Sequence, residues 1–447
     1  MPNNGDLIAA VSTAPGPGAL AVVRLSGAGT LNTLARVFRS KKSLEENPRT
    51  LIRGRVVDPR DGGTADHALA VWFPGPSSFT GEDSAEIQGH GGSLIPGLVL
   101  RLLLDEGARL ARPGEFTERA FLNGKLSLDQ AEAVAEIVAA ESAAEAKIAA
   151  RTLDGALKEK VSAIFLAMKG AYARLTAVLD FEEEWTPKDA DDLLNALKEA
   201  RESLKSLIDL RKRGRFYRDG LKVVLAGAPN AGKSELFNAL LGKKRALVSP
   251  VPGTTRDYLT AAVSWGNVRV ELVDTAGLRE EGGDELEKMG QALALEQMGE
   301  ADLVLRLRDL TNPERIPTPE AEKGIPGLEV WNKTDLVSTD RGPLPPGLKI
   351  SAKTGDGLEE LKEAALKLLG IQGARIPDIV PNLRQEKAIE ESHRLLEEAV
   401  ASLSSGEPPE ICGVLLRRSL DRLGEVTGRV FTEDLLTEVF KRFCLGK

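Results

Sequence analysis

The sequence has few of the residues that mark secreted or zinc-binding proteins. Among its 447 residues are two cysteines, Cys412 and Cys444, and three histidines. Two cysteines cannot form a disulfide framework, so we expect a reducing, cytoplasmic compartment. The cysteines and histidines are also too scattered to form a zinc cluster.

Long apolar runs and an excess of positive charge are lacking as well. We see no apolar run that approaches the roughly 20 residues a membrane-spanning helix needs. The opening MPNNGDLIAAVSTAPGPG has neither the basic start nor the apolar centre of a secretion signal. The net charge is -8, so a dominant basic field for nucleic acid is absent, and any RNA contact requires a local basic patch.

Three textures along the chain predict an α/β plus all-α fold. Up to about residue 120, short apolar runs alternate with Gly/Pro turns, which indicates strands with a few helices. Long Ala/Leu/Glu/Lys-rich stretches predict amphipathic helices, and strands alternate with helices between them. We expect an N-terminal α/β domain at 1–120, a helical domain in two parts at 121–215 and 376–447, and an inserted Ras-like P-loop domain at 216–375.

The stretch LKVVLAGAPNAGKSELFNALL is the most informative in the chain. An apolar strand leads into Gly227-x-x-x-x-Gly232-Lys233-Ser234, and an amphipathic helix follows. The glycines allow backbone N–H groups to surround a polyphosphate, and the helix N-terminus adds partial positive charge. Lys233 can reach the β- and γ-phosphates, and the Ser234 hydroxyl can bind Mg²⁺. This order predicts a P-loop rather than an ordinary glycine-rich turn.

A second motif, LEVWNKTDL, predicts that the bound base is guanine. It places Asn332, Lys333 and Asp335 at the end of an apolar run, about 100 residues after the P-loop. Asp335 can accept from the N1–H and amino groups of guanine, a donor pair that adenine lacks, so a buried carboxylate here would discriminate strongly. The motif LKISAKTGDG follows another strand, and its backbone could contact the guanine oxygen through Ser351, Ala352 and Lys353.

Two further motifs complete the set of five that a GTPase domain carries. VPGTTRD offers Thr255 as a second Mg²⁺ ligand. VELVDTAGLRE ends a strand at Asp274, which suits a water-mediated Mg²⁺ contact, and continues to Gly277, whose N–H can hold the γ-phosphate. Such loops order around the γ-phosphate and relax after hydrolysis.

The residue after Gly277 departs from the Ras-like pattern. Ras-like GTPases have a glutamine there that orients the attacking water, whereas this chain has Leu278, which cannot do so. An acidic residue of REEGGDELEKMG is one replacement, although acidic residues on a solvated helix are the commoner case. Arg256 and Arg279 are possible arginine fingers, and a monovalent cation bound by the Asn230 carbonyl is the alternative.

Six motifs along the whole chain resemble one GTPase family. They are SFTGEDSAEIQGHGG, ARPGEFTERAFLNGKLSLDQAEAV, GAPNAGKSELFNALL, VPGTTRDYL, DTAGLRE and FCLGK. The chain is similar to the MnmE (also called TrmE) family of tRNA-modifying GTPases. The resemblance implies an N-terminal domain that binds 5-formyltetrahydrofolate or a related tetrahydrofolate and forms a homodimer. It also implies GTP hydrolysis activated by potassium-dependent G-domain dimerisation.

The same resemblance implies a reaction and a partner. With the FAD-dependent MnmG, in a heterotetramer, the protein would help to add a (carboxymethyl)aminomethyl group to C5 of the wobble uridine of certain tRNAs. The main competing interpretation is a ribosome-assembly switch of the Era-like type, related by its G domain alone. That alternative predicts a basic RNA-binding module after the G domain, where this chain has an acidic-to-neutral helical segment.

Carried over residue by residue, the family pattern gives the following sites. Folate binding falls on Arg24, Glu86, Lys125 and Lys447. Mg²⁺ falls on Ser234 and Thr255, and K⁺ on Asn230, Ser249, Val251 and Thr254. GTP binding falls on Asn230, Ala231, Gly232, Lys233, Ser234, Glu235, Ser249, Pro250, Val251, Pro252, Gly253, Thr254, Thr255, Asp274, Thr275, Ala276, Gly277, Asn332, Lys333, Asp335, Ser351, Ala352 and Lys353. The water-orienting glutamate falls on Glu287, with Glu285 as the alternative because EEGGDELE is one residue longer than the usual pattern.

Three features keep two interpretations each. Cys444, near the end of the chain, is either a nucleophile beside the one-carbon site or a packed residue. The resemblance implies that the tail reaches the folate site. We therefore expect this end of the chain to be docked. His90, between glycines, is either a base or a hydrogen-bonded structural residue. The basic run RKRGRFYRDGLK at 211–222 is either an RNA contact or a hinge into the G domain.

Overall fold

The computed structural model of the chain describes residues 5–180, 186–242, 259–274, 299–312, 324–337, 345, 347–373, 375–444 and 446–447. The chain divides into two compact units. The first unit contains Met1–Ala139, Ala149–Asp209 and Pro381–Lys447, and the second contains Ala140–Ile148 and Leu210–Val380.

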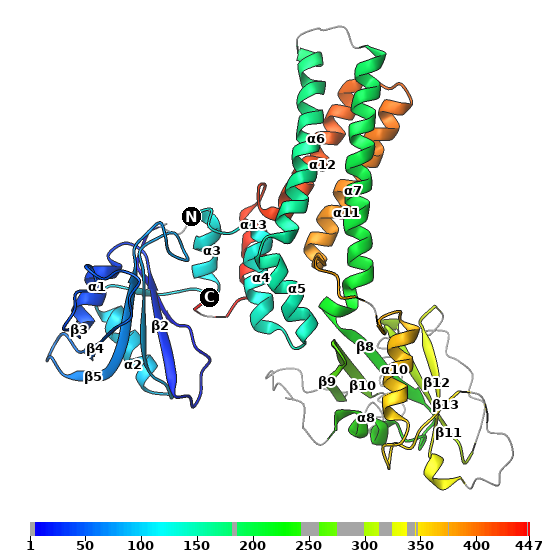
Figure 1. Cartoon of the computed structure of the whole chain (residues 1–447), viewed down its shortest axis with the longest axis horizontal. Helices are drawn as coiled ribbons and strands as arrows, with labels where there is room; N and C mark the ends of the chain where they lie inside the picture. The colour runs from blue at the N-terminus through cyan, green and yellow to red at the C-terminus, as the bar shows by residue number, and fades with distance from the viewer. Residues whose placement is uncertain are drawn as a thin grey trace, which may run out of the picture. The chain divides into compact units, whose positions relative to one another are not determined.

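The first unit begins with a seven-stranded mixed sheet, of which Figure 1 labels β2 to β5 beside α1 and α2. The strand order is β3-β4-β5-β6-β2-β1-β7, and β7 is parallel to β1. Its strands are β1 (Ile8–Val11), β2 (Leu20–Ser26), β3 (Phe38–Ser40), β4 (Ile52–Val57), β5 (Thr64–Phe73), β6 (Ser84–His90) and β7 (Arg109–Leu110). Side chains alternate between the two faces, so on β6 Ala85 and Ile87 are buried while Glu86 and Gln88 lie on the opposite face. The buried face packs against α1 (Thr30–Val37) and α2 (Ile95–Asp105).

One end of the opposite face of this sheet is covered. Here α3 (Glu115–Leu122) places Phe116 against Ile8 and Ala10. Arg119 of α3 is 4% exposed, and its guanidinium pairs with Asp6, Glu82 and Glu115 at 2.5–3.0 Å. Burial favours a raised pKa for Glu115, but hydrogen bonds from Arg109, Arg112 and Arg119 outweigh it and lower the pKa to about 2. This network fixes α3 against the sheet.

The helical part of the first unit is built from two stretches that are separate in the sequence, within 128–219 and 383–440. Its helices are α4 (Leu128–Ala139), α5 (Ala143–Leu153), α6 (Ala156–Asp180), α7 (Pro187–Asp219), α11 (Leu383–Ser404), α12 (Pro409–Thr427) and α13 (Glu433–Phe440), and α5 and α7 contribute residues to both units. A capping box of Asn382 and Gln385 begins α11. Buried hydroxyl bonds between Ser392 and Ser419 join α11 to α12.

Helix α6 corrects one expectation from the sequence. Its segment Ala156–Leu179 is long and apolar enough to cross a membrane by length and composition alone, with 28% of its most apolar window buried. A single helix of this kind is weak evidence, because core helices of globular proteins meet the same test. In this chain α6 packs on α12, and Leu157, Met168 and Leu175 are fully buried.

The second unit has a six-stranded sheet of order β13-β12-β11-β8-β10-β9, parallel except for β9. Its elements are β8 (Leu221–Gly227), α8 (Lys233–Leu241), β9 (Leu259–Trp265), β10 (Val268–Asp274), β11 (Leu303–Asp309), β12 (Gly327–Asn332), the 3-10 helix η3 (Thr334–Leu336), β13 (Leu348–Lys349) and α10 (Leu358–Leu368). The buried positions of its central parallel strands are mostly Val and Leu, as in Val223–Leu225 of β8 and Leu303–Leu305 of β11, which is expected where both faces of a sheet are covered.

The basic run at 211–222 takes part in packing. Arg211 is 5% exposed and pairs with Asp219 at 2.5 Å, and Arg215 pairs with Asp302 at 3.0 Å. Arg218 donates to the carbonyl of Val380, and the Tyr217 hydroxyl donates to the carbonyl of Ile371. These contacts favour the hinge interpretation of the run over the RNA interpretation.

Candidate functional site

The carboxyl ends of the parallel strands in the second unit bring the predicted nucleotide residues together. Strands β8, β10, β11 and β12 end at Gly227, Asp274, Asp309 and Asn332. Their parallel pairing sets these ends along one edge of the sheet. In open α/β sheets ligands bind in the crevice at this edge.

The P-loop has the backbone that the sequence predicts. Gly227 and Gly232 have φ values of 152° and 93°, and a Cβ on Gly232 would lie 2.2 Å from the Asn332 amide nitrogen. Asn230 has φ 63°, a left-handed conformation that side chains other than glycine rarely adopt. The Lys233 ammonium donates to the carbonyls of Gly227 and Ala228 at 3.0 and 2.9 Å. Ser234 and Glu235 are exposed in the first turn of α8.

Asn332 connects three motifs that are distant in the sequence. Its side chain is fully buried, donates to the Ala231 carbonyl at 3.0 Å and accepts from the Ala352 N–H at 2.9 Å. The sequence predicted Asn332 as a nucleotide contact but gave no sign of this link. Because both bonds are buried, the loss of either would leave an unpaired polar group. Asn332 therefore holds the P-loop and the loop that begins with Ser351, Ala352 and Lys353, which we call the SAK loop, in one arrangement.

Asp335 is the middle residue of η3, and the Ser351 hydroxyl donates to its Oδ1 at 2.6 Å. The expectation of a buried carboxylate is wrong, because Asp335 is exposed. Ser351 instead fixes its orientation. Lys353, also predicted at this site, is exposed, whereas Ala352 is buried. The carboxylate is thus oriented by a neighbouring motif rather than by burial.

Lys333 is a second left-handed residue at this edge, with φ 70°. Its ammonium pairs with Asp309 at 2.6 Å. Burial favours a raised pKa for Asp309, but hydrogen bonds from Lys333 and Thr311 outweigh it and lower the pKa below its usual value. Asn230 and Lys333 are two of the three left-handed non-glycine residues in the described chain. Such strain concentrates at binding sites.

Several predicted residues lie outside the described part of the chain. They are Ser249, Pro250, Val251, Pro252, Gly253, Thr254, Thr255, Thr275, Ala276, Gly277, Glu285 and Glu287, together with Arg256, Leu278 and Arg279.

The first unit contains the other predicted site, centred on Arg24. The Arg24 guanidinium donates to Glu86 at 2.8 and 3.1 Å from the neighbouring strand. The rings of Phe79 and Phe116 lie 5.9 and 5.8 Å from it. Phe79 is 43% exposed, so this aromatic surface remains accessible.

The C-terminal tail reaches this site. The carbonyl of Gly446 accepts from the Ser12 hydroxyl at 3.1 Å and from Arg24 at 3.5 Å. Gly446 has φ +83°, and a Cβ there would lie 2.5 Å from the Val11 carbonyl oxygen. The prediction of a docked end is confirmed, and only glycine fits so close to β1.

Packing before the tail explains why the end is ordered. Phe440 and Phe443 lie in one buried cluster with Phe121 and Leu128. The Cys444 carbonyl accepts from the Gly114 N–H at 3.4 Å, while the residue itself is exposed. Lys447 follows and is half-buried.

The remaining predicted residues have clear places. Lys125 is exposed and donates to the Pro76 carbonyl at 3.0 Å, on the loop that carries Phe79. His90 is bonded through Nδ1 to the buried Asp66 at 2.6 Å, with its side chain 70% exposed. Cys412 is fully buried, and burial raises the pKa of its thiol to about 11, as expected of a structural cysteine.

Comparisons with known proteins cover the whole chain. The family model described as the MnmE helical domain matches residues 128–444, and that of the GTP-binding protein TrmE N-terminus matches residues 7–125. A protein of Thermus thermophilus named tRNA modification GTPase MnmE is 40% identical over 100% of both chains. One of the same name from Akkermansia muciniphila is 39% identical over 98% of both. The chain belongs to the MnmE family.

Membership in the MnmE family confirms the predicted resemblance and fold class. An Era-like switch related by its G domain alone does not account for matches over 7–125 and 128–444. Among solved structures, Aquifex aeolicus Era bound to GDP·AlF4⁻ is 28% identical, covers 39% of this chain and 66% of its own, and has a TM-score of 0.26. The G domain of T. maritima FeoB is 28% identical, covers 33% of this chain and 98% of its own, and has a TM-score of 0.24.

Some residues around the predicted Arg24 site were missed from the sequence. Phe79 and Phe116 flank Arg24, Ser12 binds the same Gly446 carbonyl as Arg24, and the buried Arg119 supports the helix that carries Phe116. Phe79 and Phe116 lie inside the motifs SFTGED and RPGEFTE. Motif position was the only available signal for them, because their contacts come from different elements of the fold.

Proposed function

We propose that this MnmE-family chain is a GTP hydrolase that works with the FAD-dependent MnmG. Together they would add a (carboxymethyl)aminomethyl group to C5 of the wobble uridine of certain tRNAs, using a tetrahydrofolate one-carbon unit. The docked tail carries the proposal, because Gly446 binds beside Arg24 and so brings the Cys444 segment to the predicted folate site. The working form is a cytoplasmic homodimer that joins MnmG in a heterotetramer. Analysis of wobble uridines in tRNA from cells without this gene tests the whole proposal, and unchanged modification would refute it.

The nucleotide is GTP with Mg²⁺. The P-loop backbone and Lys233 bind the phosphates, and Asp335 reads guanine. The donor set suits Mg²⁺, since Ser234 presents a hydroxyl in the first turn of α8 and the fully buried Asp274 ends the adjacent strand β10. Ser234 and Thr255 would be direct ligands, and the ion would neutralise charge on the phosphates.

A potassium ion replaces the arginine finger. The left-handed backbone at Asn230 supports this role, because it makes a sharp turn within the phosphate loop. Ser249, Val251 and Thr254 complete the ligand set. Glu287, or Glu285 as the alternative, orients the attacking water in place of a glutamine.

GTP turnover is expected to be at least about tenfold faster in KCl than in NaCl at equal ionic strength. The reason is that transition-state charge stabilisation is worth about 10³-fold or more in phosphoryl transfer, and the smaller Na⁺ fits a K⁺ cage poorly. Steady-state phosphate release measures the turnover rate in each salt. Asn230→Ala should abolish the difference while keeping nucleotide affinity, and equal wild-type rates in both salts would contradict the potassium role.

The tail site binds the reduced folate. Arg24, Lys125 and Lys447 supply positive charge for its carboxylates, and Glu86 can accept from the amino group of its pterin. The accessible Phe79 ring offers a stacking surface.

Calorimetry with 5-formyltetrahydrofolate is expected to show binding that Arg24→Ala weakens by about tenfold or more, because a charge-assisted hydrogen bond is lost and Glu86 loses its partner. Arg36→Ala is a matched control, since it also removes an arginine paired with a glutamate, but at an exposed position. Equal weakening by both variants would refute a specific site, and so would a wild-type protein that shows no binding.

A further inference from the structure

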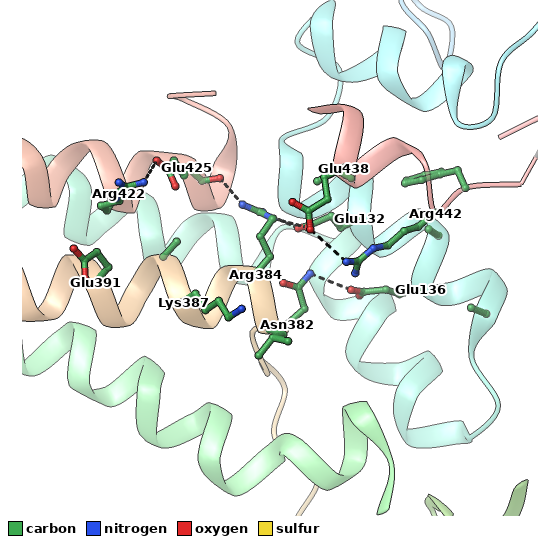
Figure 2. A pocket seen from close by; sticks show the side chains of 16 residues that line it. Glu132, Glu136, Asn382, Arg384, Lys387, Glu391, Arg422, Glu425, Glu438 and Arg442 are labelled. Atoms are coloured by element: carbon green, nitrogen blue, oxygen red, sulfur yellow. Dashed lines mark hydrogen bonds and ion pairs between the residues drawn. The ribbon is translucent and has the colours of Figure 1, made fainter. Parts of the chain in front are cut away.

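Two cavities in the first unit differ sharply in charge. One, of about 590 Å³, lies among α4, α11, α12 and α13 (Figure 2). Its three arginines each pair with a glutamate of the same wall, at distances of 2.6 Å for Arg384 with Glu132, 2.8 Å for Arg422 with Glu425 and 3.5 Å for Arg442 with Glu438. Because these charges are already paired within the wall, the cavity attracts a charged ligand only weakly.

The other cavity, of about 800 Å³, is a groove at the β3 edge of the N-terminal sheet. Five arginine and lysine residues line it together with His67, and none of its lining residues is Asp or Glu. The five are Arg39, Lys41, Lys42, Arg53 and Arg55. We call this feature the basic groove. It is a local positive surface on a chain of net charge -8.

Strand pairing places the basic groove on one face of the sheet. Arg39 lies directly opposite Arg55, and Arg55 lies opposite His67. Arg53 is two residues from Arg55, so it projects from the same face. Lys41 and Lys42 follow β3 in the adjoining turn. Like charges directly opposite each other destabilise a sheet, so the protein maintains this row at a cost.

No carboxylate in the described chain offsets this charge. The ion pairs there include none with Lys41, Lys42, Arg53 or Arg55, and Arg39 donates to the backbone carbonyl of Ala35. The basic run at 211–222 is different, because Arg211 and Arg215 are paired with aspartates. The basic groove is therefore a region where positive charge is available to an external anion.

We propose that the basic groove binds the phosphate backbone of the tRNA substrate. This inference rests on the proposed function in tRNA modification. The groove is lined by hydroxyl, aliphatic and cationic side chains and by no Phe, Tyr or Trp, so it contacts phosphates rather than stacking bases. A second copy of the chain is a poorer occupant, because a symmetric interface would set the same positive charges against each other.

The test is fluorescence anisotropy with an unmodified tRNA transcript at KCl concentrations from about 50 to about 200 mM. The quadruple variant K41Q/K42Q/R53Q/R55Q should bind about tenfold or more weakly, and its salt slope should be shallower by roughly 3, since each lost phosphate contact contributes about 0.7–0.9. GTP hydrolysis should match wild type, and the thermal melting temperature should not fall, because the variant removes the like-charge pair of Arg39 and Arg55. The charge-preserving variant K41R/K42R/R53K/R55K should bind as wild type does.

A control variant loses the same charge elsewhere in the first unit. It replaces four exposed residues that have no ion pair in the described chain, in the form R101Q/K160Q/K169Q/K198Q. Equal affinities and slopes for the control and the basic-groove variant would overturn the proposal. The proposal would also be overturned if the basic-groove variant bound tRNA as wild type does but showed a changed oligomer mass in light scattering. That result would indicate that the groove contacts another protein chain. Complementation of cells without this gene separates a failure of the basic-groove proposal from a failure of the proposed function. A wild-type gene that fails to restore modification refutes the proposed function itself.

Discussion

Replacing Asp335 by asparagine is expected to lower GTP affinity by about 10³-fold or more, because the site is built to accept the paired donors of guanine. The asparagine amide would place its own donor against them. The same change should raise affinity for xanthosine triphosphate, whose C2 carbonyl can accept from the new amide. Ser351 can still donate to the remaining carbonyl, so the loop should keep its position. Titration with fluorescent nucleotide analogues measures both affinities.

Asp356→Asn is the matched control for this prediction. Asp356 lies in the adjacent SAK loop and accepts from the Thr354 hydroxyl at 2.7 Å, and the bond from the Ser351 N–H goes to its backbone carbonyl. The same chemical change at this position should leave GTP affinity unchanged. A D335N protein with wild-type GTP affinity and no gain for the xanthine nucleotide would move base recognition away from Asp335.

Replacing Cys444 by serine is expected to abolish wobble-uridine modification and to spare GTP hydrolysis. The substitution keeps the shape of the side chain but replaces a thiol with a far weaker nucleophile. Cys444 is exposed and is held by its backbone bond to Gly114, so the tail should remain docked. Nucleoside mass spectrometry of tRNA from complemented cells and phosphate release by the purified protein give the two readouts.

Two further variants distinguish chemistry from packing. Cys412→Ser makes the same change at a fully buried position, so it should lower stability by about 1–3 kcal/mol through an unpaired hydroxyl and leave modification intact. Gly446→Ala keeps the thiol but forces a Cβ against the Val11 carbonyl, so it should displace the tail and reduce modification. Full modification by the C444S protein would make Cys444 a packing residue.

The nucleotide motifs were predictable because their chemistry is local. A P-loop is a contiguous strand, turn and helix, and its ligand contacts come from neighbouring backbone groups. The exposure of Asp335 was not predictable, since it depends on how η3 is placed beside the SAK loop. The bridge made by Asn332 joins segments 101 and 20 residues away, and no sequence period reports such a pairing.

The same limit applies to the charged segments. The run at 211–222 was the visible candidate for RNA contact, but the tertiary structure pairs Arg211 and Arg215 with aspartates. The basic groove was invisible in the sequence because Arg39, Arg55 and His67 come from three different strands. Strand register alone aligns them.

By itself, the sequence determined the GTPase motifs and the helical and α/β character of each segment. The order of motifs along the whole chain also indicated the family. These properties reside in contiguous residues and in hydrophobic periodicity. Only the tertiary structure decided which charges are neutralised, which carboxylate is exposed and where the chain ends. The tail shows this most clearly, because the Gly446 carbonyl meets Arg24 across 422 residues. That contact depends on the packing of Phe440 of α13, and of Phe443 beyond it, in one cluster with residues of α3 and α4.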